Sequence, residues 1–283
     1  MAITRKTQSL NNVVAGGSVS GDMQIGLRYD SVTLELTNVL PADIKNIQWR
    51  LNNKTFQEYS SGQVVADLNG FYQNDDGVGF LTFHFARPEL ANLIQRNHTA
   101  IDTGPRDKIK YPASKFPNLI FAESFQILFD LDAGVLNPGI VATAKLAPSG
   151  GAGIGRIIKV KRNPVSSASA GLFELSSILK SPANRAIHIL DTDAVNNTRP
   201  SYVTVEKNGH KVHEASHGLI NEILKKFNRT PVVGYYHIDF AMEGDLGTSL
   251  NTEEASDWRI LSTLPESGSF EVIMEYVEPL NGK

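Results

Sequence analysis

The sequence contains no cysteine, so neither disulfide bonds nor thiol chemistry is available to this protein. Its apolar runs are short and broken by Asn, Asp, Gly or Pro, and none approaches the roughly 20 residues that a membrane-spanning helix needs. The start, MAITRKTQSLNN, lacks the apolar core of a signal peptide, which predicts synthesis in the cytoplasm. Stability is therefore expected to come from packing or assembly.

An excess of positive charge is also absent. The chain has 27 Lys and Arg against 30 Asp and Glu, whereas a dedicated nucleic-acid binder normally presents a basic face. We therefore expect no direct contact with nucleic acid. Hydrophobic residues make up 41% of the 283 residues, which is typical of a soluble globular protein with one large domain or two ordinary ones.

What the sequence does contain is an internal repeat. Residues 206–227, EKNGHKVHEASHGLINEILKKF, align without a gap with residues 50–71, RLNNKTFQEYSSGQVVADLNGF. Three more blocks recur in the same order, namely residues 47–49 with 203–205, GFLTFHFA with GYYHIDFA, and SFQILFDLD with SFEVIMEYV. A period of about 150 residues is too long for a solenoid and indicates a duplicated domain.

Each copy has the pattern of a β-sandwich with one helix. Runs such as IKNIQWRL and ESFQILFDLD alternate apolar and polar residues, which predicts about seven or eight short strands per copy. In the first copy, Ser60 or Ser61 is placed to cap a helix. Apolar residues at helical spacing then follow, namely Val64, Val65, Leu68 and Phe71.

Two sandwich folds fit these local patterns. Eight strands in two facing sheets form a jelly roll, and an immunoglobulin-like sandwich has a similar local signature. The helix inserted in both copies favours the jelly roll. The predicted fold is therefore all-β, with two tandem eight-stranded jelly rolls (a double jelly roll), each with an inserted short helix.

Composition sets the predicted domain boundaries. Residues 1–145 form the first jelly roll, residues 146–155 form a Gly/Ser/Pro-rich linker, and residues 156–283 form the second jelly roll. Residues 102–118 are a Pro-rich insertion without periodicity, as expected of a surface loop with a packing or assembly role. The polar tail EPLNGK is expected to be loose.

The most conspicuous motif is HEASH, a literal HExxH formed by His213, Glu214 and His217. In zinc peptidases, a helix places the two His residues one turn apart to bind the metal, while the Glu acts as general base. Here the strand pattern runs through Glu214 and the helix is expected to begin near Ser216, so the two His residues would straddle a boundary and point apart. The first copy has Gln57, Glu58 and Ser61 at the equivalent positions. We therefore expect no zinc, and two surface His residues at a loop corner.

Other polar residues have structural interpretations as well. His84 and Asp239 occupy equivalent strand positions and are expected on polar outward faces. The stretch GGAGIG lacks the Lys-Ser/Thr ending of a phosphate loop. A solvated sheet face, with an anionic membrane surface as the alternative, is predicted for the basic cluster of Arg156, Lys159, Lys161 and Arg162.

Paired acidic residues are the remaining candidates for a metal site. They are Asp75 with Asp76, Asp130 with Asp132, and Asp191 with Asp193. Carboxylates of this kind bind calcium, but none of the pairs reproduces the twelve-residue loop with its closing Glu. No catalytic or cofactor-binding residue is predicted, and the metal ligands stay unknown.

Six runs in order carry a family resemblance: SLNNVVAGGSVS, DIKNIQWRL, LTFHFARPEL, FDLD, YYHIDFAMEGD and VIMEYV. With this order and spacing the chain resembles the major capsid proteins of corticoviruses, tailless icosahedral bacteriophages with an internal membrane. The similarity extends over most of the chain and is poor in residues 102–118 and in the predicted linker. The family offers no catalytic motif to carry over.

The resemblance implies a structural protein of the virion, made in the host bacterial cytoplasm. It implies two jelly rolls perpendicular to the capsid surface, homotrimers of pseudo-hexagonal outline, and an icosahedral shell over an internal membrane. The implied partners are neighbouring capsomers and other capsid and membrane proteins, with calcium ions in the shell. Two alternatives stay open: a tandem β-sandwich that binds carbohydrate, and a zinc peptidase using HEASH. The carbohydrate alternative requires exposed aromatic residues, whereas Trp49 and Trp258 lie in strand patterns and are expected to be buried.

Overall fold

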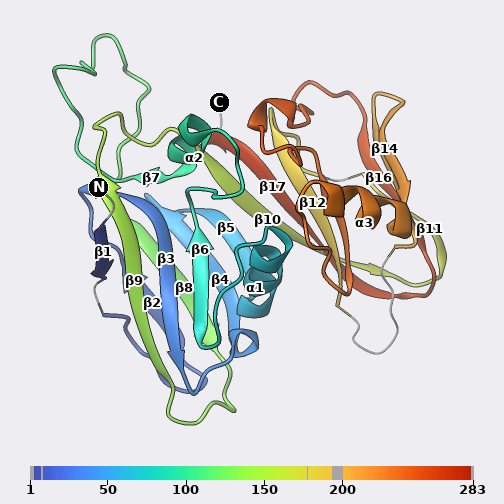
Figure 1. Cartoon of the computed structure of the whole chain (residues 1–283), viewed down its shortest axis with the longest axis horizontal. Coiled ribbons are helices and arrows are strands. Elements are labelled where there is room, and N and C mark those ends of the chain that lie inside the picture. The colour runs from blue at the N-terminus through green and yellow to red at the C-terminus, as the bar shows by residue number, and fades with distance from the viewer. Residues whose placement is uncertain (1–2, 8, 177, 193–199, 282–283) are drawn as a thin grey trace. The chain divides into compact units, whose positions relative to one another are not determined.

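The computed structural model describes residues 3–7, 9–176, 178–192 and 200–281, which fold into two compact units. The first unit comprises Met1–Gly70, Asn74–Lys159 and Glu278–Lys283, and the second comprises Phe71–Gln73 and Val160–Val277. Figure 1 shows the chain, with most helices and strands of both units labelled. No helix among the described residues is long and apolar enough to cross a membrane.

The described part of the first unit contains nine strands. These are β1 (Ile3–Lys6), β2 (Ser18–Asp22), β3 (Leu27–Thr37), β4 (Ile44–Leu51), β5 (Lys54–Ser61), β6 (Phe80–His84), β7 (Ile101–Asp102), β8 (Phe125–Leu131) and β9 (Gly139–Pro148). One sheet has the order β1-β9-β3-β6, and the two-residue β7 also pairs with β3. The other sheet has the order β5-β4-β8-β2. Neighbouring strands in both sheets pair antiparallel, as expected of a jelly roll.

Trp49 is the central aromatic residue of the first unit. It lies on β4, where every second side chain points inward, and it is fully buried. Its ring centroid is 5.1–5.3 Å from those of Phe83, Phe85 and Phe125. Phe83 and Phe85 come from β6 and the residue just after it, so one aromatic cluster joins the two sheets of the sandwich.

Two helices follow strands of the first unit, α1 (Gly62–Phe71) and α2 (Leu93–Thr99). Ser61 caps α1 by accepting a hydrogen bond from the Val64 amide at 3.4 Å. The four apolar residues that the sequence assigned to the inner face of this helix are all buried. Gly62 is required at its start, because a Cβ atom there would lie 2.5 Å from the carbonyl oxygen of Pro41.

Among the described residues, eight strands in the same succession lie mostly or wholly in the second unit. These are β10 (Arg156–Ser167), β11 (Gly171–Leu175), β12 (Asn184–Asp191), β13 (Tyr202–Lys207), β14 (His210–Ser216), β15 (Tyr235–Asp239), β16 (Trp258–Leu264) and β17 (Gly268–Pro279). Their sheets have the orders β10-β17-β12-β15 and β11-β16-β13-β14. These orders match β1-β9-β3-β6 and β2-β8-β4-β5 strand for strand. The predicted pair of eight-stranded jelly rolls is therefore confirmed.

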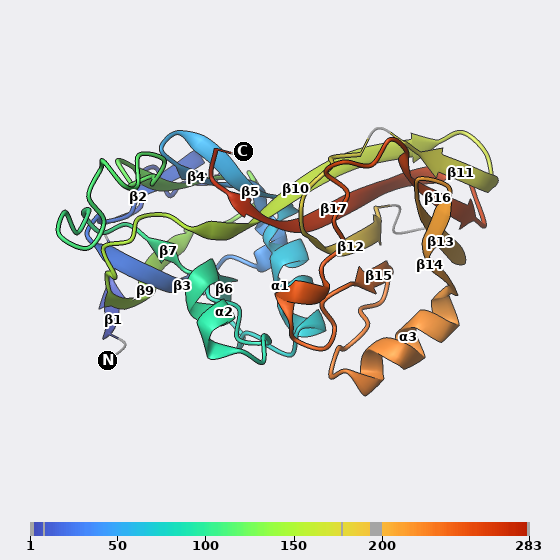
Figure 2. The same ribbon diagram turned by 90° about the horizontal axis from the view of Figure 1, so that it is seen from above.

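A helix occupies the same place in both units. As α1 follows β5, α3 (His217–Lys226) continues directly from β14, as Figure 2 shows. Ser216 caps α3 by accepting a hydrogen bond from the Leu219 amide at 3.3 Å. Ile220 and Leu224 form its buried side. The inserted helix that the repeat predicted is thus present in both units.

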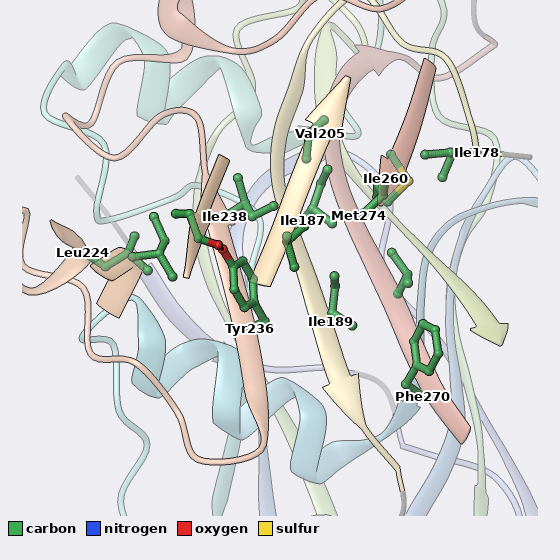
Figure 3. Packing of buried hydrophobic residues seen from close by; sticks show 14 of the residues in the cluster. Ile178, Ile187, Ile189, Val205, Leu224, Tyr236, Ile238, Ile260, Phe270 and Met274 are labelled. Atoms are coloured by element: carbon green, nitrogen blue, oxygen red, sulfur yellow. The ribbon is translucent and has the colours of Figure 1, made fainter. Parts of the chain in front are cut away.

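The core of the second unit is centred on β12. Ile187 and Ile189 are fully buried on this strand, and β15 and β17 pair with it on either side. Figure 3 shows their side chains between Tyr236 of β15 and Met274 of β17. Because β12 is an inner strand, it reads RAIHIL rather than as a simple alternation of apolar and polar residues.

Two segments differ from the sequence-based expectation. The predicted linker, residues 146–155, belongs to the first unit, and its first three residues end β9. Leu146 and Ile154 are buried, and the Ile154 amide donates to the carbonyl of Ile120 at 2.7 Å. The small residues of this stretch thus serve close packing rather than a free linker. The tail was expected to be loose, but β17 continues to Pro279 and Leu280 is buried.

Candidate functional site

The HEASH motif lies at the junction of β14 and α3. His213 is on β14, with Nε2 3.1 Å from the Tyr236 hydroxyl. His217 is the first residue of α3, with Nε2 3.1 Å from the carbonyl oxygen of Tyr235. The two His residues therefore lie on different elements, as the sequence predicted. They are not surface residues, however, because both are half-buried with their rings beside Tyr236.

The arrangement around HEASH does not assemble a zinc peptidase. Glu214 forms an exposed ion pair with Lys211, away from the two ring nitrogens. Burial lowers the pKa of His213 to about 4. Among the residues that the structure describes, no group of three or more His, Asp or Glu side chains is placed to hold a metal ion. Nothing in this geometry supplies the third ligand that a catalytic zinc needs.

A second pair of histidines, which sequence reasoning missed, lies inside the second unit. His188 of β12 and His237 of β15 are direct partners in the sheet, and both are fully buried. Their Nδ1 atoms are 2.8 Å apart. The available signal was a polar residue at the centre of two otherwise apolar runs, RAIHIL and YYHIDF.

The hydrogen bonds around this pair fix where its protons lie. His237 Nε2 accepts from the Val232 amide at 3.3 Å, so the proton of a neutral His237 is on Nδ1 and is donated to His188. His188 then carries its proton on Nε2, which faces the Tyr72 hydroxyl at 3.4 Å. Tyr72 in turn donates to Glu275 at 3.0 Å. The chain of hydrogen bonds is satisfied when both rings are neutral.

Two buried ion pairs complete this polar core. Arg185 Nη1 lies 2.9 Å from Glu275 Oε2, and Arg229 Nε lies 2.8 Å from Asp239 Oδ2. The Arg185 guanidinium also stacks over the ring of Tyr72, 4.3 Å from its centroid. We expected Asp239 on an outward face, and that expectation is wrong, because its side chain is buried and paired with Arg229.

Burial governs the titration of this cluster. It lowers the pKa of His237 well below the usual value, and the nearby His188 and His217 act in the same direction while Glu275 opposes them. Burial also raises the pKa of Asp239, against the effect of Arg185 and Arg229. His188, His237, Asp239, Arg185 and Glu275 are all buried, as expected of side chains that support the fold.

The remaining sequence candidates are dispersed. The expected solvated basic face is only partly correct, because Lys159 is buried and paired with Glu278 at 3.3 Å, and Arg162 lies 3.7 Å from Glu271. Lys161 is exposed. Trp49 and Trp258 are both buried, which confirms the expectation for them, so neither can serve as the aromatic platform of a carbohydrate site.

Two of the paired acidic residues, Asp130 and Asp76, accept hydrogen bonds from protein groups. Asp130 accepts hydrogen bonds from Ser18 at 2.6 Å and Asn46 at 3.1 Å, and these bonds lower its pKa. Asp76 accepts from the side chain of Asn69 and from the Thr82 amide. Asp130 therefore links strand β8 to β2 and β4, and Asp76 holds a loop next to β6. Asp193 lies outside the described residues.

The family models agree with this organisation. Residues 4–147 match the viral coat protein P2 N-terminal domain, and residues 157–280 match the viral coat protein P2 C-terminal domain. Among curated proteins, the chain is 26% identical over 286 residues to the major capsid protein P2 of Pseudoalteromonas phage PM2, covering 95% of this chain and 94% of that protein.

The fold is similar to those of several solved capsid proteins. The crystal structure of the major capsid protein P2 from bacteriophage PM2 matches with a TM-score of 0.85 and 22% identity, covering 98% of this chain and 97% of that chain. The capsid protein in the atomic structure of Sulfolobus turreted icosahedral virus matches with a TM-score of 0.66 and 11% identity, over 98% and 90% of the chains. A PBCV-1 virus capsid structure matches with a TM-score of 0.67 and 9% identity, over 98% and 93%.

Proposed function

Since the chain belongs to the viral coat protein P2 family and is a structural capsid protein of the virion, we propose that three copies associate into the building block of the shell. Each chain then contributes two jelly rolls, and the trimer presents six similar corners. A block of this outline tiles an icosahedral shell through lateral contacts with neighbouring capsomers. The family's members are coat proteins, so no enzymatic step is part of this function.

One observation carries the proposal. The two units have the same strand order in both sheets, and in each unit a helix follows the fifth strand. A rotation that repeats the chain three times therefore produces a pseudo-six-fold arrangement of equivalent elements from a single gene product. A permanent interface between the chains is expected to bury more than about 2,000 Å².

The Pro-rich insertion is the segment we assign to contacts between chains. It has no helix or strand between β7 and the bridge at Ile120, yet it is held by its own contacts. The Arg106 guanidinium lies 4.7 Å from the centroid of Phe121 and donates to the carbonyl of Phe116 at 3.2 Å. Ile109 and Phe116 remain exposed. A pre-ordered loop with exposed apolar side chains binds a partner at little entropic cost.

We further propose that the shell encloses a membrane and meets other capsid and membrane proteins, as the family resemblance implies. Structural calcium stays a prediction of that resemblance. No cluster of three or more acidic or His side chains that could hold a metal ion occurs among the described residues, so any calcium ligands would have to include carbonyl, amide or water oxygens.

Sedimentation equilibrium of the purified chain tests the proposal. We expect a species of three times the chain mass at micromolar concentration, with no dimer accumulating between monomer and trimer. A monomer that persists over the whole accessible concentration range would contradict a trimeric building block. Electron microscopy of the same preparation should show particles of hexagonal outline.

A further inference from the structure

A polar groove lies on the outer face of the first sheet of the first unit. It has a volume of about 430 Å³ and is bordered by β3, β6, β9 and α2. Its floor includes Ser31 and Thr82, both less than a tenth exposed. A surface loop of Ala86, Arg87 and Pro88 forms part of its wall. The groove belongs to none of the sites described above.

The strand registers bring the floor residues into rows. Ser31 of β3 pairs with His84 of β6 on one side and with Lys145 of β9 on the other. Thr33 pairs with Thr82 in the next row, and their hydroxyl oxygens are 2.9 Å apart. Residues two apart on a strand share a face, so hydroxyl, imidazole and ammonium groups line one surface.

The groove carries a net positive charge. Arg87 lies 3.9 Å from Glu89, and Asp30 lies 3.1 Å from Arg28, so these charges are compensated. The remaining cations are Arg96 and Lys145, neither of which has an ion-pair partner among the described residues. Arg96 is anchored through Nε, which donates to the carbonyl of Leu90.

The pKa of His84 is affected by the same positive charges. Burial lowers its pKa, and the charges of Arg87 and Lys145 lower it further, against Glu89 and Asp76. At neutral pH the imidazole is therefore uncharged and offers one donor and one acceptor. Burial would disfavour any charge here, but the positive charges of Arg87 and Lys145 that disfavour a proton on His84 would attract a bound anion.

We propose that this groove binds a phosphate group carried by a small polyol. A guanidinium and an ammonium group are the usual partners of phosphate oxygens, and the hydroxyls of Ser31, Thr33 and Thr82 supply further hydrogen bonds. The groove is larger than a bare phosphate ion requires, and the remaining lining is rich in polar groups suited to polyol hydroxyls. Glycerol phosphate has this chemistry, either free or as the headgroup of an anionic phospholipid.

Isothermal titration calorimetry on the full chain tests the proposal, with sn-glycerol 3-phosphate as the ligand and glycerol as the uncharged control. We expect glycerol phosphate to bind and glycerol to give no signal. Arg96→Gln and Lys145→Gln should each weaken binding about 10-fold or more, the usual effect of losing a hydrogen bond to a charged group. Lys161→Gln, which removes an exposed lysine of β10 outside the groove, should leave the affinity unchanged.

Vesicle co-sedimentation distinguishes the two sources. Binding to phosphatidylglycerol vesicles but not to phosphatidylcholine vesicles, reduced by Lys145→Gln and not by Lys161→Gln, would support the groove as a headgroup site. Binding of glycerol phosphate without vesicle binding would support a soluble ligand. The proposal fails if neither probe binds, or if the Arg96 and Lys145 variants, with unchanged thermal melting, bind as well as the unaltered chain.

Discussion

His188 and His237 face each other across β12 and β15, fully buried, with their Nδ1 atoms 2.8 Å apart. One proton lies between the two rings, and the other nitrogens face the Val232 amide and the Tyr72 hydroxyl. A further proton on His237 Nε2 would oppose the Val232 N–H, and one on His188 Nδ1 would oppose the ring of His237. Burial and these contacts therefore disfavour a positive charge on His237 in the folded second unit.

The first prediction is that the protein loses stability as the pH falls below about 6.5, the ordinary His pKa in an unfolded chain. Burial holds the pKa of His237 well below that value and the pKa of His213 at about 4. Between pH 6.5 and these lowered pKa values, the unfolded chain binds more protons than the folded chain. The free energy of unfolding should then fall by about 1.4 kcal/mol per pH unit for each such His, and change little from these groups above pH 7.5. Urea unfolding between pH 5 and pH 8 measures it.

A variant isolates the contribution of one ring. His213→Gln keeps a hydrogen-bonding side chain beside Tyr236 but has no titrating group. Between pH 6.5 and pH 4, its free energy of unfolding should fall less steeply than that of the unaltered chain, by about 1.4 kcal/mol per pH unit, because one His fewer titrates. The opposite sign of Asp239, whose pKa is raised by burial, is common to both proteins and cancels in the comparison. Identical slopes for the two proteins would contradict the assignment.

The second prediction concerns Trp49. Trp49→Ala should lower the free energy of unfolding by about 3–5 kcal/mol, because it leaves a cavity among Phe83, Phe85 and Phe125. Trp49→Phe should cost clearly less, since it keeps most of the ring and removes an indole N–H that has no hydrogen-bond partner among the described residues. Val78→Ala, at a fully exposed position, is the control and should be neutral. Denaturant midpoints that rank otherwise would refute this account.

The third prediction concerns the ion pair of Arg229 with Asp239. Asp239→Leu should destabilise the protein by about 3–5 kcal/mol, because it leaves a guanidinium buried without its carboxylate. The double variant Arg229→Met with Asp239→Leu should be more stable than the single one, since neither charge is then left alone. A double-mutant cycle measured by urea unfolding gives the coupling energy. Additive effects would mean that the pair contributes nothing as a pair.

The fold could be predicted from the sequence because its signals are local and occur twice. Strand alternation in IKNIQWRL and the helical spacing from Val64 to Phe71 recur at equivalent places, and the structure has a strand and a helix there. The extent of the linker could not be predicted, because small residues serve flexible chains and close packing equally well. At Gly153, a Cβ atom would lie 2.4 Å from the carbonyl oxygen of Ile120, a contact that composition does not reveal.

The buried polar core was beyond sequence reasoning for a different reason. Asp239 alternates with apolar neighbours, as a solvent-facing residue would, but Arg229 covers it from a loop that precedes β15. The Arg229 guanidinium reaches the Asp239 carboxylate only in the folded chain. The groove around His84 likewise depends on the register of three strands and on α2, none of which follows from the alternation of LTFHF.

The fourth prediction concerns the HEASH motif. Addition of zinc, or its removal by a chelator, should leave the melting temperature unchanged, because His213 and His217 already bind Tyr236 and the Tyr235 carbonyl. Differential scanning fluorimetry with equimolar zinc measures this. Stabilisation by zinc that is lost in His213→Gln would show that His213 binds the metal. That result would overturn our interpretation of the junction between β14 and α3.

The fifth prediction concerns the Pro-rich insertion and assembly. Ile109 and Phe116 are exposed apolar residues on a loop that Arg106 holds in place. Replacing both by Ser should raise the concentration at which trimers dissociate by about 10-fold or more, because each buried apolar side chain contributes about 1.5–3 kcal/mol. The unfolding midpoint of the monomer should not change, since neither side chain supports the core. Val233→Ser, at an exposed apolar position of the second unit, is the matched control. An unchanged dissociation concentration in the double variant would place the trimer contact elsewhere on the chain.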